Sequence, residues 1–134
     1  MGKQNLYSSL PVYDATYQLL LEVHKIQPVL SRDVRYTIGQ GLTKLLMNIL
    51  VTIYEANIAR EKHPLLMRGR KLSVEVKVTL RILCDLKQIS EKQYVRLIDM
   101  AESVSKQLTS WDNSLGKSQQ SNVDASQREE RAVD

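Results

Sequence analysis

Residues 31–60 form the segment that most limits how this chain can fold. Their apolar side chains recur at steps of three and four, which places them on one broad face of a helix. That face comprises Ile38, Leu42, Leu45, Leu46, Met47, Ile49, Leu50, Val51, Ile53, Tyr54 and Ile58. A helix this apolar needs other helices around it in water, so the segment predicts the central rod of a bundle. Gly39 and Gly41 indicate a close approach or a bend, because each costs a helix roughly 1 kcal/mol relative to alanine.

Proline and capping residues divide the rest of the chain into three further helices. Pro11 and Pro28 bound the first of them, and the residue before Pro64 is disfavoured in a helix. Ser90 begins a capping box with Gln93, in which each side chain satisfies a free backbone amide of the other residue. We therefore predict helices over residues 12–27, 31–60, 64–88 and 90–112. The fold class that follows is all-α, an antiparallel four-helix bundle.

The third predicted helix carries two apolar rows rather than one. The rows are Leu72, Val76, Leu80 and Leu83, and Val74, Val78, Ile82 and Ile89. Two rows are typical of a helix with neighbours on two sides, either inside a bundle or at an oligomer interface. The alternation of Val74, Val76 and Val78 is also typical of a strand, but the longer flanking pattern favours the helix.

Charge is spread unevenly along the chain. The formal net charge is +4, and residues 113–134 carry three basic and four acidic side chains, which leaves +5 on residues 1–112. That excess permits contact with nucleic acid without requiring it. Residues 113–134 hold too few apolar side chains to offset the entropy of ordering them. They predict a disordered polar tail.

The sequence offers little for catalysis or for a membrane. No apolar run approaches the roughly 18 residues that cross a bilayer, and no export signal is evident. Cys84 is the single cysteine, which fits a reducing compartment, and its apolar neighbours indicate an inert thiol. His24 and His63 lack partners at metal-ligand spacing, and no nucleophile or phosphate-loop motif occurs. We therefore predict a cytoplasmic non-enzyme that uses no metal or cofactor.

Basic side chains give the clearest functional indication. Five of them fall within residues 60–71, and Arg70, Lys77 and Arg81 step by seven and four, which places them on one helix face. The candidate nucleic-acid-binding residues are Arg32, Arg35, Arg60, Lys62, Arg68, Arg70, Lys71, Lys77 and Arg81. A solvated surface explains each residue alone, but phosphate neutralisation needs several spread cations, so the set is a candidate contact surface. Tyr36 is placed either to stack on a base or to pack.

Four short stretches occur in a characteristic order and spacing. The chain carries S-R-x-x-R-Y-T-I-G at residues 31–39, I-x-E-A-N at residues 53–57, a polar corner at residues 88–94, and Trp111. Together they resemble the four-helix bundle proteins called Avd, the accessory variability determinant of diversity-generating retroelements. The likeness covers residues 6–112 and leaves out the polar tail.

The resemblance implies a function that the residues alone do not. Avd proteins form a barrel-like homopentamer and bind the reverse transcriptase and template RNA of a retroelement, whose mutagenised cDNA diversifies a target gene. This chain would then be a non-catalytic accessory subunit whose partners are the polymerase, template RNA, cDNA and further copies of itself. Two alternatives stay open. One is the sister family encoded by intervening sequences in bacterial ribosomal RNA genes, and the other is a general helical interaction scaffold.

Overall fold

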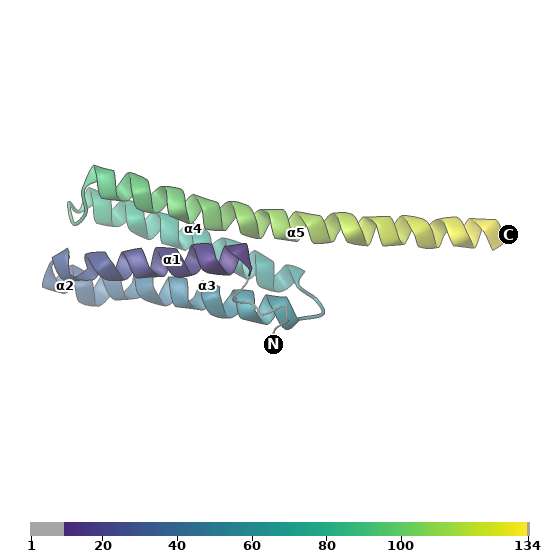
Figure 1. Cartoon of the computed structure of the whole chain (residues 1–134), viewed down its shortest axis with the longest axis horizontal. Helices are drawn as coiled ribbons and strands as arrows, with labels where there is room; N and C mark the ends of the chain where they lie inside the picture. The colour runs from purple at the N-terminus through teal and green to yellow at the C-terminus, as the bar shows by residue number, and fades with distance from the viewer. Residues whose placement is uncertain (1–9, 134) are drawn as a thin grey trace.

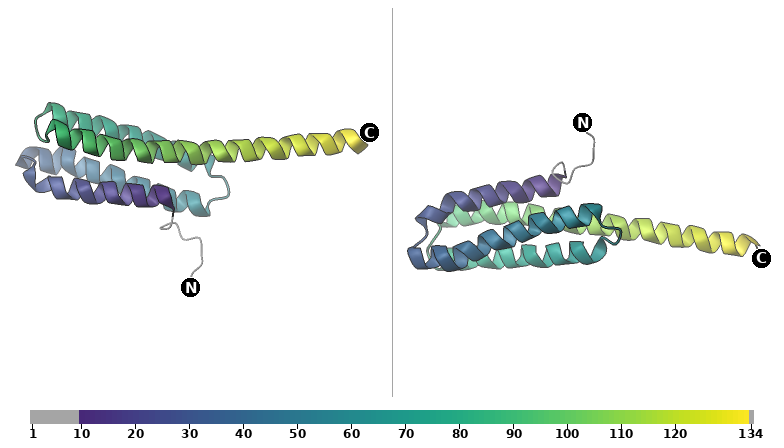
Figure 2. Two further views of the ribbon diagram at one scale, coloured as in Figure 1. Left: turned by 45° about the horizontal axis from the view of Figure 1, so that its top comes forward. Right: turned by 90° about the horizontal axis from the view of Figure 1, so that it is seen from below.

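Four long helices pack side by side in the structure, a computed structural model that describes the backbone of residues 10–133 and the side chains of residues 10–117 (Figure 1). They are α1 (Pro11–Ile26), α3 (Gln40–Ile58), α4 (His63–Asp85) and α5 (Glu91–Val133). Each helix packs against two others, in the order α1, α3, α4, α5 and back to α1 (Figure 2). Within residues 10–133 the structure contains no strand. The predicted all-α bundle is confirmed, and the valine-rich segment is helical.

Aliphatic side chains from all four long helices hold the bundle together. Leu19 of α1, Ile53 of α3, Leu80 of α4 and Leu108 of α5 are each at most 1% exposed. Removing one such side chain from water contributes about 1.5–3 kcal/mol. The apolar face predicted for the second helix mostly points into this core. The exceptions are 44–68% exposed: Met47, Val51, Tyr54 and Ile58.

The predicted second helix is irregular near its start. A 3₁₀ turn, η2 (Gln27–Val29), a single turn, α2 (Arg32–Val34), and a π-helical turn, η3 (Arg35–Gly39), precede α3. The regular α-helix therefore begins at Gln40 rather than at residue 31.

Gln27 explains this irregular start. Its side-chain Nε2 donates to the carbonyl oxygen of Gly39 at 3.0 Å and to Thr43 Oγ1 at 3.2 Å. A side chain inserted against a helical backbone is a recognised cause of such irregular turns. A Cβ added at Gly39 would lie 2.5 Å from Gln27 Oε1 and 2.9 Å from Leu30 Cδ1. The predicted close approach is thus confirmed at Gly39, whereas Gly41 has no atom within 4 Å of such a Cβ.

The turn between α4 and α5 fixes one end of the bundle. Lys87 adopts a left-handed conformation, with φ of 61°, and α4 stops before the predicted end at residue 88. Gln88 Oε1 accepts a hydrogen bond from the backbone amide of Ser31 at 2.8 Å, which joins this turn to the start of α2. The predicted capping box is confirmed: the Gln93 amide donates to Ser90 Oγ at 3.0 Å, and the Ser90 amide donates to Gln93 Oε1 at 2.9 Å.

The C-terminal part of the chain differs from the predicted disordered tail. α5 does not end near residue 112 but continues as one helix to Val133, projecting beyond the other three helices (Figure 1). Residues 113–133 contain no proline, and Gly116 alone costs roughly 1 kcal/mol. Many of the other residues are good helix formers, including glutamine, arginine, glutamate and alanine. The polarity of the segment did not predict its helical backbone.

The two glycines near the start of α3 should respond oppositely to alanine. Gly39→Ala is expected to lower the free energy of unfolding by about 1–3 kcal/mol, because the added methyl group overpacks against Gln27 and Leu30. Gly41→Ala, at an open helical position, is expected to raise it by about 0.5–1 kcal/mol. Urea unfolding followed by circular dichroism measures both. Equal effects at the two positions would contradict the packing argument.

Candidate nucleic-acid interface

Two of the nine predicted cations donate hydrogen bonds to backbone carbonyl oxygens and are not free surface charges. The Arg35 guanidinium donates to the carbonyl oxygens of Gln27, Pro28 and Leu30, at 3.1, 2.9 and 3.1 Å. It thereby holds the link between α1 and α3. Lys62 Nζ donates to three carbonyl oxygens at the end of α3, at 2.8–3.1 Å. Such carbonyls have no partner within their own helix, so Lys62 acts as a C-terminal cap.

Four more of the predicted cations are paired with carboxylates. The ion pairs are Arg68–Glu55 at 3.1 Å, Arg70–Asp112 at 3.2 Å, Lys77–Glu102 at 2.8 Å and Arg81–Asp85 at 3.1 Å. The hydrogen bond from Lys77 lowers the pKa of Glu102, and the charge of Lys106 adds to this effect. The hydrogen bond to Asp85 raises the pKa of Arg81. Each of these cations thus already lies beside a negative charge, which weakens the field that it offers to a phosphate.

The last three predicted cations lie apart from one another. Arg32, Arg60 and Lys71 are exposed, and within the part of the chain whose side chains are described they have no hydrogen bond or ion pair. Arg32 lies in α2 at one end of the bundle, whereas Arg60 lies in the connection from α3 to α4 at the opposite end (Figure 1). Lys71 lies on the outer side of α4. The nine residues therefore do not form one continuous surface of free positive charge. Tyr36, beside Arg32, is 61% exposed and does not pack inside the bundle.

A buried carboxylate, which the sequence did not reveal, fixes α5 where it leaves the bundle. Asp112 is only 6% exposed. Its Oδ1 lies 2.6 Å from His63 Nδ1, and its Oδ2 accepts a hydrogen bond from Arg70 at 3.2 Å. His63 thus ties the first turn of α4 to α5. The carboxylate of Asp112 thus lies on the side of α5 that faces α4.

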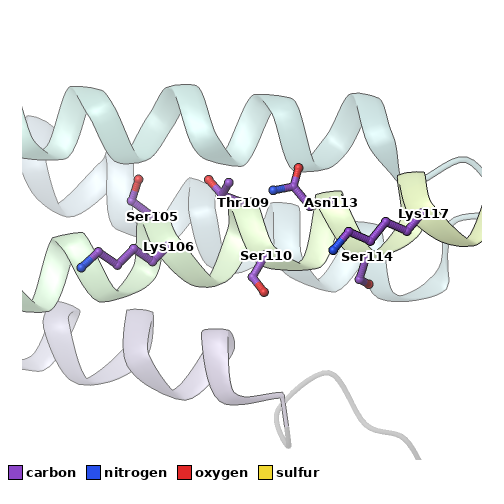
Figure 3. A pocket seen from close by; sticks show the side chains of 7 residues that line it. All are labelled: Ser105, Lys106, Thr109, Ser110, Asn113, Ser114 and Lys117. Atoms are coloured by element: carbon purple, nitrogen blue, oxygen red, sulfur yellow. The ribbon is translucent and has the colours of Figure 1, made fainter.

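A polar face of α5, also missed by the sequence reasoning, is free of acidic side chains. Seven residues line a shallow hollow of about 440 Å³ there: Ser105, Lys106, Thr109, Ser110, Asn113, Ser114 and Lys117 (Figure 3). We call this set the α5 polar face. Lys106 and Lys117 are exposed and form no ion pair with the described side chains. Residues 106, 110, 113 and 117 step by four, three and four, so helical spacing could have revealed the face.

The chemistry of this face suits an extended anion. Lysine ammonium, serine and threonine hydroxyl and asparagine amide groups are the side-chain donors that commonly contact phosphate oxygens. Lys106 and Lys117 are eleven residues apart, which is about 16 Å along a helix. A chain of phosphates matches that spread better than a single small anion does. No group of three or more histidine, cysteine or acidic side chains among the described residues could hold a metal ion.

No protein-family model matches the chain, and no curated protein does so at a significant level. Within the described residues, no helix has the length and apolar character needed to cross a membrane.

The role of Asp112 is open to a direct test. Asp112→Ala is expected to lower the free energy of unfolding by about 1–3 kcal/mol, because His63 and Arg70 lose their shared acceptor. Asn113→Ala, at the next and exposed position, is expected to change it by less than about 0.5 kcal/mol. Urea denaturation of both variants measures the free energy of unfolding. A similar change in the two variants would contradict a stabilising role for the contacts of Asp112 with His63 and Arg70.

Proposed function

We propose that this protein is a non-catalytic accessory subunit of a diversity-generating retroelement. It binds the reverse transcriptase together with template RNA and cDNA, and it supports mutagenic reverse transcription in the cytoplasm. The likeness of residues 6–112 to Avd proteins and the helical bundle both support this proposal. The observation that carries the nucleic-acid part is the α5 polar face, whose seven lining residues include two exposed lysines and no carboxylate. As the resemblance implies, the working form is a homo-oligomer, with five copies as the expected number.

The proposed contact with nucleic acid lies on the α5 polar face and not on the cations predicted from the sequence. Arg70 and Lys77 bridge to α5, so they stabilise the bundle before they can serve a phosphate. Lys106 and Lys117 form no ion-pair contact with the described side chains, although the charge of Lys106 acts on Glu102, which is already paired with Lys77. Hydroxyl groups lie between the two lysines. Contacts of this kind recognise the phosphate backbone rather than base sequence, so binding is expected to depend strongly on salt.

Charge reversal on this face tests the proposal. The double variant Lys106→Glu, Lys117→Glu is expected to bind single-stranded RNA roughly tenfold more weakly at 0.1 M salt, because two phosphate contacts are lost. The slope of log affinity against log salt should fall by about 1.4. Fluorescence anisotropy with a labelled oligonucleotide measures both quantities.

Lys92→Glu is the matched control. Lys92 is also an exposed lysine of α5 but lies outside the α5 polar face. It should leave affinity and salt slope close to those of the unmodified protein. Unchanged binding in the double variant, or an equal loss in the control, would rule out the α5 polar face as the RNA contact.

The proposed binding of the reverse transcriptase is tested separately. The chain is expressed with the reverse transcriptase and template RNA encoded beside it, and then purified at physiological salt. Elution of all three in a fixed ratio is the expected result. Retention of the polymerase without RNA would instead favour a second candidate, a helical protein-interaction scaffold. The exposed apolar side chains of α3 and α4 are the observation that favours this candidate.

A further inference from the structure

The surface of the bundle is apolar in two separate places. The first is a hollow of about 200 Å³ between α1 and α3, lined by Tyr13, Met47, Leu50, Val51 and Tyr54. We call it the α1–α3 groove. Tyr17 of α1 and Ile58 of α3, 43% and 68% exposed, extend its apolar rim. Glycine and charged residues are absent from the lining, so the groove offers an apolar ligand a nearly uniform surface.

The second place is a row of side chains along α4. Met67, Val74, Val78 and Ile82 are each 41–53% exposed. They step by seven, four and four residues, so they lie on one side of α4, with the exposed Lys71 between Met67 and Val74; we call the four apolar residues the α4 ridge. Arg68 on one flank bonds to α3 and Lys77 on the other bonds to α5, so the ridge points away from both neighbouring helices. Of the second apolar row predicted for this helix, Val74, Val78 and Ile82 thus point outward, whereas Ile89 lies beyond α4 and is buried in the core.

The size of these surfaces is typical of an interface. With side chains of about 150–250 Å² each, the exposed fractions amount to roughly 400 Å² on each of the two surfaces. Each is within the range of about 300–600 Å² that the largest apolar patch of a typical monomer covers, and such patches are often functional. Covering both in one contact would bury roughly 800 Å² of apolar area, and a polar rim brings the total to the range of about 1,200–2,000 Å² seen in stable complexes.

The shapes of the two surfaces are complementary. The groove is a concave seam between two helices, whereas the ridge is one convex helix, and ridges pack into grooves in helix–helix contacts. Two ridges placed together would leave both grooves open, and two grooves cannot fill each other. We propose that the α4 ridge of one copy packs into the α1–α3 groove of a second copy, which joins copies head to tail. This inference rests on the self-assembly included in the proposed function and assigns its interface.

The arrangement of helices lets every copy use both surfaces at once. α4 lies diagonally opposite α1 in the bundle, so the ridge and the groove face different directions (Figure 2). A contact between unlike surfaces repeats from copy to copy and gives a ring if the rotation closes. α5 contributes to neither surface, so the α5 polar face stays uncovered in the assembly.

Two charge substitutions at exposed positions test the pairing. Val78→Asp blocks the ridge and Val51→Asp blocks the groove, and both side chains are about half exposed, so the bundle should still fold. Circular dichroism checks the helical content. Light scattering during gel filtration is expected to give an oligomer for the unmodified protein and a single copy, 15.4 kDa, for each variant. Ser110→Asp, on the α5 polar face, should keep the mass of the unmodified protein.

The decisive measurement is a mixture of the two variants. The Val78→Asp copy keeps its groove and the Val51→Asp copy keeps its ridge, so a head-to-tail contact predicts a dimer containing one of each. A mixture that stays monomeric overturns the pairing, and so does a variant that alone keeps the full mass. A monomeric unmodified protein at tens of micromolar would overturn self-assembly itself. The anisotropy measurement on Lys106 and Lys117 stands apart from these outcomes, because it concerns the α5 polar face.

Discussion

Close packing of aliphatic side chains between four helices is the constraint on which the other features depend. The chain has no phenylalanine and one tryptophan, so leucine, isoleucine and valine fill the core. Such side chains are held by shape rather than by hydrogen bonds, and in this bundle they line the inner sides of all four long helices. The turns at the two ends then determine which surface each helix presents. At those ends, backbone groups and side chains that would otherwise lack partners form hydrogen bonds with Arg35, Lys62 and Asp112.

The division of the outer surface follows from this packing. Each helix uses one side for the core and two flanks for its neighbours, and only the outermost side is free to vary. On α3 and α4 that side includes several apolar residues, whereas residues 105–117 of α5 present lysine, serine, threonine and asparagine. Different regions of one small bundle can thus support different proposed contacts without competing for the same residues. The ion pairs between α4 and α5 lie on the flanks and belong to the bundle itself.

Periodicity was sufficient to predict the helices and the core, because a repeat of three and four residues has one physical meaning in an apolar segment. It could not predict what a cation touches. Lys62 and Arg60 lie two residues apart in a basic stretch, yet only Lys62 reaches carbonyl oxygens, at the end of α3. Periodicity also could not predict that the α5 polar face lacks a carboxylate, because the direction of the Asp112 side chain is not visible in the sequence. In the sequence Asp112 stands between Lys106 and Lys117 as a compensating charge, but in the structure it turns inward to His63.

Because α5 is long, the contacts of Asp112 with His63 and Arg70 have a mechanical consequence. The helix is held by α4 through Asp112 and by the core through Leu108 and Leu115. Beyond Leu115, eighteen further residues reach Val133, about 27 Å of helix. A helix fixed at one end acts as a lever, so a tilt of ten degrees at Leu115 would displace its tip by about 5 Å. A small change in the angle between α4 and α5 therefore becomes, at the tip of α5, a movement comparable to one helical turn.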